Sequence, residues 1–267
     1  WLGQQLGIVL AEHGFSVFGS RQSTAGLAEL PSAIQPILLR LPLAITDVAL
    51  TEIFSESWLI CAIPPSARQQ SATHYAEQLQ SLVALAAAAG VRGVIHCSST
   101  GVYQGLTGDV DEESQVQPGG RAGLLLAAEQ ILQQIPNCIT LRLAGLIGPG
   151  RNPARFGQGG TLSGPDLPVN LVHAADIGRF VLMLLHDAAA PKSVPPRVSQ
   201  SKIFNLCCPE HPQKADFYHA AALQAWGAAG VDLHAIARVV AQVGAQMRAN
   251  PAITEIDINP LVAYPAG

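Results

Sequence analysis

His96-Cys-Ser-Ser-Thr-Gly-Val-Tyr103 follows a short apolar run and leads into a polar loop, and the predicted fold is built outward from it. The apolar residues Val94 and Ile95 lead into it, and an acidic, proline-containing segment at 109–118 follows it. A short apolar run bounded by polar residues is typical of a buried strand. We therefore predict a strand over residues 94–97 that ends beside a pair of serines.

Short β-branched runs alternate with longer runs rich in alanine and leucine along the chain. This alternation indicates parallel strands joined by crossover helices. We predict an α/β fold with a Rossmann-type, doubly wound parallel sheet, whose ligand crevice lies at the carboxyl ends of the strands. The predicted strands are residues 15–18, 43–45, 58–63, 94–97, 139–143, 172–174 and 203–207. The predicted helices are residues 3–13, 68–89, 120–134 and 177–186 and a last helix from 216, with residues 144–170 as a loop.

The composition narrows the class of protein. Of the 267 residues, 49% are apolar and 13% are charged, which excludes a disordered chain. The net charge of −4 leaves no basic surface for a phosphate backbone, so nucleic acid is not an expected partner. With no secretory signal and no apolar stretch of the ~20 residues that span a bilayer, we expect a cytoplasmic protein without a membrane partner. The five scattered cysteines are expected to be structural, and no metal site is predicted.

The block at 96–103 resembles the strand end that carries the active-site serine in short-chain dehydrogenase/reductase proteins of the extended, sugar-epimerase type. Further segments resemble the same family in the same order, at residues 141–151, 170–177 and 204–206. Residues 142–151 resemble an atypical YeeZ-like branch, which carries the NAD-dependent epimerase/dehydratase description by fold. The resemblance covers residues 1–222. It implies an NAD(P)-binding protein with a small-molecule substrate, acting as an oxidoreductase or a nucleotide-sugar epimerase/dehydratase.

The residues that complete the family's proton transfer are missing from their usual positions. In the resembled family, a tyrosine supplies the proton, and a lysine four residues later lowers the pKa of that tyrosine. The resemblance puts Arg121 at the tyrosine position and Leu125 at the lysine position. Ser99 and Tyr103 are therefore the catalytic candidates, with Tyr103 as a replacement acid. The alternative is a catalytically silent, NADP-binding regulatory module that lacks the Tyr/Lys pair.

The same resemblance implies residues that line a substrate site. An arginine is always charged, so it cannot act as a general acid, but it can clamp an anionic substrate. The implied substrate residues are Ser99, Arg121, Gly145 and Arg151.

Trp1-Leu2-Gly3 leads directly into a predicted helix. A Gly-x-Gly-x-x-Gly fingerprint joins the first strand of a dinucleotide-binding fold to its first helix, whose N–H groups receive the pyrophosphate. The resemblance makes Gly3 the third of these glycines, so we expect the first strand to lie before residue 1, in an N-terminally truncated sheet. Arg21 follows the next strand and favours the 2′-phosphate of NADP, with NAD as the alternative. The implied cofactor-binding residues are Trp1, Leu2, Gly3, Ser20, Arg21, Ala62, Ile63, Pro64 and Ser98.

The last part of the chain has a different character. Residues 253–262 resemble the carboxyl-terminal piece of an ATP-grasp acyl-CoA synthetase, and strand alternation would place Asp257 and Asn259 on one face. The implied function is that of an ATP-grasp ligase fragment. The alternatives are a helix-strand unit without a ligand and a joined or misassembled chain.

The domain organisation follows from these segments. We predict an NAD(P)-binding domain over 1–222, with substrate-side loops at 144–170 and 188–216, and an appended tail over 223–267. The resemblance also implies a homodimer through the helices at 68–89 and 120–134, although the sequence alone leaves the oligomeric state open.

Overall fold

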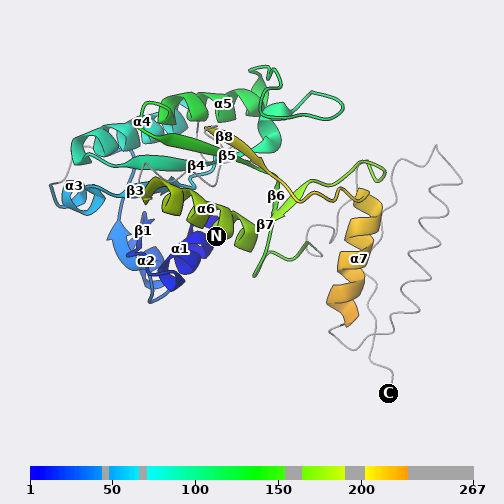
Figure 1. Ribbon diagram of the computed structural model, residues 1–267, viewed down its shortest axis with the longest axis horizontal. Helices are drawn as coiled ribbons and strands as arrows, with labels where there is room; N and C mark the ends of the chain where they lie inside the picture. Colours follow the sequence, from blue (N-terminus) through cyan, green and yellow to red (C-terminus); the bar gives the residue numbers. More distant parts are fainter. Residues whose placement is uncertain (44–47, 66–70, 154–163, 190–201, 228–267) are drawn as a thin grey trace, which may run out of the picture. The chain divides into compact units, whose positions relative to one another are not determined.

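The computed structural model describes residues 1–43, 48–65, 71–153, 164–189 and 202–227, with side chains up to residue 222 (Figure 1). The chain divides into two compact units. Unit 1 comprises Trp1–Ala144 and Ala174–Cys207, and unit 2 comprises Gly145–His173 and Cys208–Gly267.

Unit 1 is built on parallel strands in two groups. A four-stranded sheet has the order β3 (Trp58–Cys61), β4 (Gly93–Ser99), β5 (Cys138–Leu143) and β8 (Ile203–Leu206). A separate pair consists of β1 (Phe18–Arg21) and β2 (Gln35–Leu38). Every pairing in both groups is parallel, which confirms the Rossmann-like α/β fold predicted from the alternation of the sequence.

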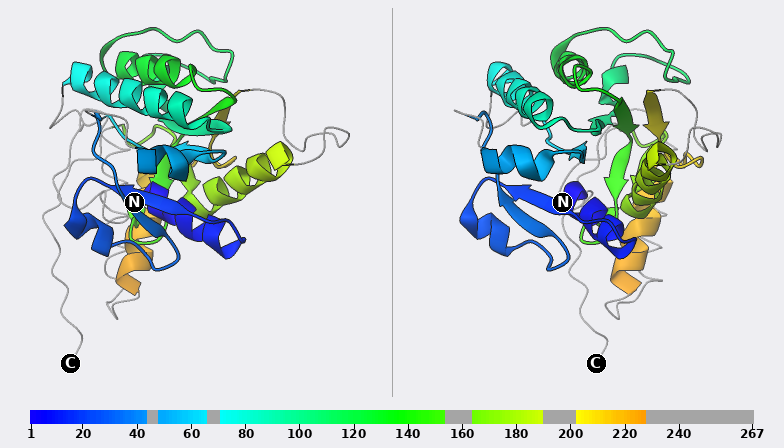
Figure 2. Two further views of the ribbon diagram at one scale, coloured as in Figure 1. Left: turned by 90° about the vertical axis from the view of Figure 1, so that its left-hand side faces the viewer. Right: turned by 60° about the vertical axis from the view of Figure 1, so that its left-hand side comes forward.

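Helices cover both faces of the four-stranded sheet (Figures 1 and 2). The helices α4 and α5 pack together on one face, and α1 and α6 pack together on the other. The helices α1 and α6 lie close together because α6 carries Gly178, where an added Cβ atom would lie 3.1 Å from Cγ1 of Val9 in α1. The bounds are α1 Leu2–Glu12, α2 Thr24–Ala28, α3 Val48–Phe54, α4 Ala72–Ala89, the 3-10 helix η1 Thr100–Tyr103, α5 Gly120–Leu132 and α6 Ala174–Ala189.

The sequence defines both ends of α4. The hydroxyl of Ser71 accepts a hydrogen bond from the His74 N–H at 3.1 Å, which satisfies a donor that has no partner inside the helix. Gly90 ends the helix in the left-handed conformation, at φ 66°, which glycine adopts without steric cost.

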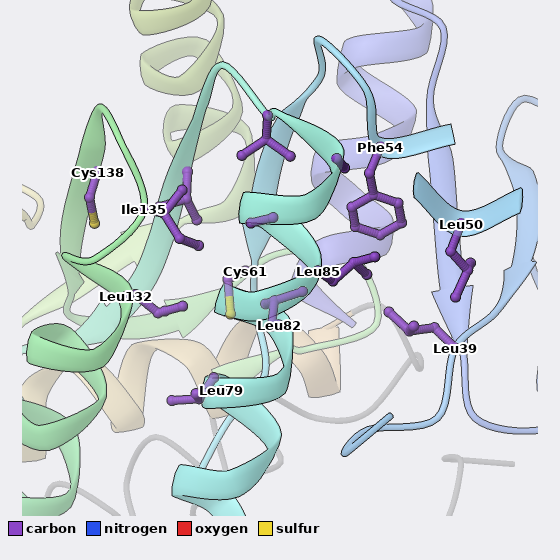
Figure 3. Close-up of a cluster of buried hydrophobic side chains, with 14 of the residues drawn as sticks. Leu39, Leu50, Phe54, Cys61, Leu79, Leu82, Leu85, Leu132, Ile135 and Cys138 are labelled. Atoms are coloured by element: carbon purple, nitrogen blue, oxygen red, sulfur yellow. The ribbon is translucent and has the colours of Figure 1, made fainter. Parts of the chain in front are cut away.

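The apolar face of α4 packs into the largest cluster of buried side chains (Figure 3). Leu79, Leu82 and Leu85 recur every three residues and lie on that face. Cys61 of β3 and Leu132 of α5 belong to the same cluster. The core therefore joins the first strand of the four-stranded sheet to the α4–α5 layer.

Gly93, at the start of β4, is expected to tolerate no side chain. A Cβ atom there would lie 2.5 Å from Cζ3 of Trp58 and 2.9 Å from the carbonyl oxygen of Asn137. Gly93→Ala is therefore expected to lower the free energy of unfolding by about 1–3 kcal/mol, measured by urea unfolding. Gly123→Ala in α5 is the control, because the nearest atom would lie 3.7 Å away; it should stabilise by roughly 0.5–1 kcal/mol. Equal effects of the two changes would contradict this packing argument.

Several strands and loops differ from the bounds that were predicted from the local sequence. The strand predicted at 15–18 is β1, which begins only at Phe18, where its pairing with Gln35 starts. No strand was predicted at β2, because Pro36 argues against one. The strand β2 has only β1 as a neighbour in its pair, and at such an edge a missing N–H donor is tolerated. The predicted strand at 43–45 falls largely outside the described residues. The predicted loop at 144–170 was wrong in part, since it contains a short strand.

Unit 2 has a parallel pair of its own. That pair is β6 (Gly145–Ile147) with β7 (Leu171–His173), and α7 (Lys214–Gly227) belongs to the same unit. The N–H of Val169 donates to the carbonyl oxygen of Pro212 at 2.9 Å, which joins the two segments of the unit. Within the described ranges, no helix is both long enough and apolar enough to cross a membrane. The predicted domain bounds stay a prediction.

Candidate functional site

A cavity of about 550 Å³ lies within unit 1 between β1 and β3. Residues of both strands and of α1 line it. One end, which we call the mouth, lies where β1 and β3 finish and α1 begins. The mouth is lined by Trp1, Gly3, Ser20, Arg21, Ala62 and Ile63. All of these are predicted cofactor-binding residues, so the structure brings most of the predicted cofactor site together.

The first turn of α1 approaches the end of β3 closely. A Cβ atom at Gly3 would lie 3.7 Å from the Cβ atom of Ala62, which is ordinary contact. Trp1, the residue before the helix, makes no side-chain capping bond to it, and no capping bond from another described residue is seen. The N–H groups of a first helical turn, together with the helix dipole, favour an anionic group. This turn can therefore receive a pyrophosphate, as the fingerprint resemblance implies.

Arg21 is the cationic group that closes the β1 side of the mouth. Its Nη2 donates to Oε1 of Gln4 at 3.3 Å, and its Nη1 donates to the carbonyl oxygen of Ser20 at 3.0 Å. These bonds hold the guanidinium beside the first turn of α1. A guanidinium carries five N–H donors, so the two bonds leave donors for a phosphate. The position and charge of Arg21 suit a phosphate group.

A hydrogen bond from α4 shapes the turn after β3. The hydroxyl of Tyr75 donates to the carbonyl oxygen of Ile63 at 3.0 Å. Tyr75 is buried, and burial raises the pKa of its hydroxyl, so the group stays protonated and able to donate. The bond positions Ile63 at the mouth.

Three of the predicted cofactor-binding residues do not line the cavity: Leu2, Pro64 and Ser98. The side chain of Leu2 is buried on α1. Ser98 is buried on β4, and its hydroxyl donates to Oε1 of Glu129 at 2.6 Å. A role for Ser98 at the cofactor therefore needs a different side-chain arrangement.

Ser98 belongs to a buried polar network that joins β4, η1, α5, β5 and β8. Arg142 and Glu129 form its ion pair, with Nη2 to Oε2 at 2.9 Å and Nε to Oε1 at 3.2 Å. Nη1 of Arg142 donates to the hydroxyl oxygen of Tyr103 at 2.9 Å, and the Tyr103 hydroxyl donates to Oδ1 of Asn205 at 2.8 Å. The network therefore satisfies a set of polar groups that would be costly to bury alone.

The charge of Arg142 is stabilised inside this network. Burial alone would lower its pKa, but the hydrogen bonds from Arg142 to Glu129 and Tyr103 outweigh burial and raise the pKa. The guanidinium also lies 5.2 Å from the centre of the Tyr103 ring. Sequence reasoning missed Glu129, although one signal was available: a carboxylate set among the buried apolar positions Ala128 and Leu132 of α5.

The two catalytic candidates differ in their surroundings. Ser99 is only partly buried, and its Oγ accepts from the Gly101 N–H at 3.1 Å at the start of η1. A hydroxyl that accepts one bond can still donate another. Tyr103 is buried, and its hydroxyl already has one donor and one acceptor as neighbours. Ser99 is thus the better placed of the two to meet a ligand.

Leu125 and Arg121 stand at the positions of the family's lysine and tyrosine. The side chain of Leu125 is buried against Val102 and Tyr103, and a Cβ atom on Gly101 would lie 3.2 Å from its Cδ1. Position 125 therefore points into an apolar cluster. Arg121 is exposed in the first turn of α5.

The other two predicted substrate residues belong to unit 2. The N–H of Gly145 donates to the carbonyl oxygen of Asn170 at 2.9 Å. Nε of Arg151 donates to the carbonyl oxygen of Leu146 at 3.0 Å, and its side chain is exposed. Their roles stay predictions.

The parallel sheet and its two helical layers define a Rossmann-like α/β fold. A Methylobacillus flagellatus protein assigned as an NAD-dependent epimerase/dehydratase has this fold, with a TM-score of 0.64 and 23% identity over 83% of this chain and 77% of its own. MoeE5, solved with UDP-glucuronic acid and NAD, has a TM-score of 0.61 and is 21% identical over 83% of this chain and 78% of its own. The chain belongs to the YeeZ family. It is 34% identical to the YeeZ protein of Escherichia coli K12 over 224 residues, covering 82% of this chain and 78% of the relative.

Two further comparisons bear on the rest of the chain. A stretch of 41 residues is 46% identical to a trans-feruloyl-CoA synthase, but it covers 15% of this chain and 6% of that enzyme. Such a match is too short to assign an activity. No family model matches the chain. Asp257 and Asn259 lie outside the described residues, so the predicted ATP-grasp resemblance of the tail stays a prediction.

Proposed function

We propose that this protein binds a nicotinamide dinucleotide at the mouth and acts as an oxidoreductase or epimerase/dehydratase of the extended short-chain dehydrogenase/reductase class. One observation carries the proposal: the first turn of α1, Arg21 and the turn after β3 converge there. These are the groups that a pyrophosphate and a ribose phosphate require. When bound, the cofactor would supply hydride transfer. MoeE5, which shares the fold, was solved with NAD.

NADP(H) is the proposed form of the cofactor, because Arg21 carries a positive charge beside the first turn of α1. Arg21→Glu is expected to weaken NADPH binding about tenfold or more relative to NADH. It replaces a positively charged donor by a carboxylate, which repels the negative 2′-phosphate that only NADPH carries. Fluorescence titration of each nucleotide measures this ratio. Arg179→Glu is the matched control, because Arg179 is an exposed arginine on α6 that pairs with Asp176 at 2.6 Å.

The outcomes of that titration separate the two parts of the proposal. An unchanged ratio of NADPH to NADH affinity in Arg21→Glu would remove the assignment to NADP(H). If neither nucleotide changes the fluorescence, the dinucleotide site itself is wrong.

The substrate that we propose is a small molecule of the nucleotide-sugar class, which MoeE5 was also solved with. Ser99, Arg121, Gly145 and Arg151 are the proposed contacts. The resemblance supports them, and Ser99 adds a partly buried hydroxyl at the end of β4. A homodimer through α4 and α5 and a cytoplasmic location are part of the same proposal, and sedimentation of the purified protein would test the first.

A second function, cofactor binding without turnover, is favoured by Leu125 and Tyr103. Leu125 can neither bind a ribose nor lower the pKa of a phenol, and the Tyr103 hydroxyl bonds within the buried network. Conversion of UDP-glucose in the presence of NADP, followed by chromatography of the sugar nucleotide as well as by NADPH absorbance, separates the two functions. The enzymatic function predicts turnover that Ser99→Ala reduces by about 10²-fold or more. Turnover unchanged in Ser99→Ala would exclude Ser99 as a catalytic residue, and its absence in the parent chain would favour the silent binder.

A further inference from the structure

The backbone of β8 at Asn205 faces away from the sheet. The carbonyl oxygen of Lys202 accepts from the Thr140 N–H at 2.7 Å, and that of Leu206 accepts from the residue after β5 at 3.0 Å. Backbone groups of successive residues in a strand point to alternate sides, so the Asn205 N–H points outward. Since β8 is the last strand of the order β3-β4-β5-β8, the described residues provide no strand partner on that side. The Asn205 N–H therefore needs an acceptor from elsewhere.

Glu112 supplies this acceptor from a distant part of the chain. Its Oε1 accepts from the Asn205 N–H at 2.5 Å, across 93 residues of sequence. Glu112 belongs to the connection between β4 and α5, and β5 lies between β4 and β8 in the sheet. The connection therefore passes β5 and reaches the outer edge of β8. Bonds between Asp111 and Ser114, N–H to Oγ at 2.9 Å and hydroxyl to Oδ1 at 2.8 Å, close a turn around Glu112.

Asn205 also holds the other end of this segment. The Tyr103 hydroxyl donates to Oδ1 of Asn205 at 2.8 Å, so one residue fixes both ends of residues 103–112, by its side chain and by its backbone. We call residues 104–111 the flap. Every residue of the flap is exposed, and Gly105 and Gly108 have φ of 96° and 82°, which favour glycine. A segment with so few buried side chains depends on its two ends for its position.

The flap begins beside Ser99. The hydroxyl of Ser99 at the end of β4 accepts from the Gly101 N–H, and the carbonyl oxygen of Gly101 accepts from the Gln104 N–H at 3.2 Å. These bonds connect Ser99 to the start of the flap. The flap carries the apolar side chains of Leu106 and Val110, which are 36% and 39% exposed. Apolar side chains next to a few polar groups are typical of the walls of small-molecule sites.

We propose that the flap is one wall of the substrate site beside Ser99, and that Glu112 is a positioning residue that holds this wall in place through Asn205. The inference rests on the proposed nucleotide-sugar substrate. Loss of the Glu112 bond releases one end of the flap. Ser99 keeps its bond from Gly101, and Tyr103 keeps its bonds within the buried network. The loss therefore falls on substrate affinity and spares turnover at saturating substrate.

Two variants at position 112 test the role of the bond. Glu112→Ala removes the acceptor, whereas Glu112→Gln keeps an Oε1 acceptor without the charge. Glu113→Ala is the matched control, because it removes the same charge from an exposed neighbour. Calorimetric titration of the full chain with UDP-glucose in the presence of NADP measures the affinity. Glu112→Ala is expected to weaken binding about tenfold, and the other two variants should stay within about twofold of the parent.

Two further readouts accompany the titration. The Asn205 amide is expected to exchange its hydrogen about tenfold faster or more in Glu112→Ala. The amides of Phe204 and Leu206 face β5, so their unchanged exchange verifies that the variant is folded. Turnover of UDP-glucose should show a KM about tenfold higher in Glu112→Ala, with kcat within about twofold of the parent.

The outcomes separate this inference from the proposed function. Equal UDP-glucose affinity in the parent and Glu112→Ala would overturn the positioning role and leave the proposed substrate standing. Equal weakening in Glu112→Ala and Glu112→Gln would assign the effect to charge and would overturn the role of the hydrogen bond. Unchanged exchange of the Asn205 amide in Glu112→Ala would mean that Glu112 does not hold the flap. A parent chain that binds no UDP-glucose would overturn the proposed substrate itself, and the positioning role with it.

Discussion

Glu129→Ala is expected to lower the free energy of unfolding by about 3–5 kcal/mol, because it leaves the Arg142 guanidinium buried without its counter-charge. The side chains of the pair are 4% and 5% exposed, so water cannot replace the lost carboxylate. The Ser98 hydroxyl loses its acceptor in the same change. Since domains are stable by only about 5–15 kcal/mol, this single substitution removes much of the total. Urea unfolding at neutral pH measures the difference.

The exposed pair Arg92–Glu56 provides the control for this prediction. Its side chains are 57% and 75% exposed, so Glu56→Ala should change stability by less than about 1 kcal/mol. The double change Glu129→Leu with Arg142→Met should recover part of the loss, because it removes both charges rather than one. A loss in Glu129→Ala no larger than in Glu56→Ala would contradict the burial of the pair.

His96 is expected to make the protein lose stability as the pH falls from about 6.5 toward 4. Burial lowers the pKa of His96 to about 4, and the nearby Glu129 opposes this only in part. In the unfolded chain, histidine takes up a proton below its ordinary pKa of about 6.5, whereas the folded protein keeps His96 neutral until near pH 4. Protonation therefore favours the unfolded state across this window. The loss amounts to about 2 kcal/mol at pH 5 and about 3 kcal/mol at pH 4.

The environment of the imidazole explains the size of this effect. His96 is 2% exposed on β4, and its Nδ1 atom is buried and has no hydrogen-bond partner among the residues that the structure describes. A positive charge at this position would have neither water nor a paired acceptor at Nδ1.

The matched variant for this test is His96→Leu, which removes the titrating group and keeps an apolar side chain in the strand. The free energy of unfolding of both proteins is measured at pH 7.5 and pH 5. The parent should lose about 2 kcal/mol more than His96→Leu over this interval. The same pH dependence in both proteins would show that His96 titrates normally.

The local pattern of the sequence predicted the strands best where a segment is buried on both faces. β4 and β5 lie in the middle of the sheet and most of their residues are buried, and the predictions at 94–97 and 139–143 fall within them. β2 could not be predicted in this way, because Pro36 is compatible with a strand only at an edge. Whether a strand lies at an edge is a property of the assembled sheet, not of its own residues.

The residues of the candidate site also differ in how far they could be predicted from the sequence. The family resemblance implied the residues of the mouth, which lie at strand ends and at the start of a helix, where open parallel sheets bind their ligands. The predicted cofactor role of Ser98 had no such support, because the hydroxyl of Ser98 bonds to Glu129, which lies 31 residues away. The residues next to a buried hydroxyl do not indicate which distant side chain it will bond to.

The class of fold could be read from the chain alone, because β-branched runs and alanine-leucine runs alternate with the spacing of parallel strands and helices. The surroundings of residues 96–103 became visible only once the chain was folded: Tyr103 bonds with Arg142 and Asn205 in the buried network, while Ser99 stays partly exposed. It also decided that β1 and β3 face each other across a cavity. The physical reason is that strand and helix formation depend on local chemistry, whereas burial, charge pairing and unpaired edges depend on which distant segments meet.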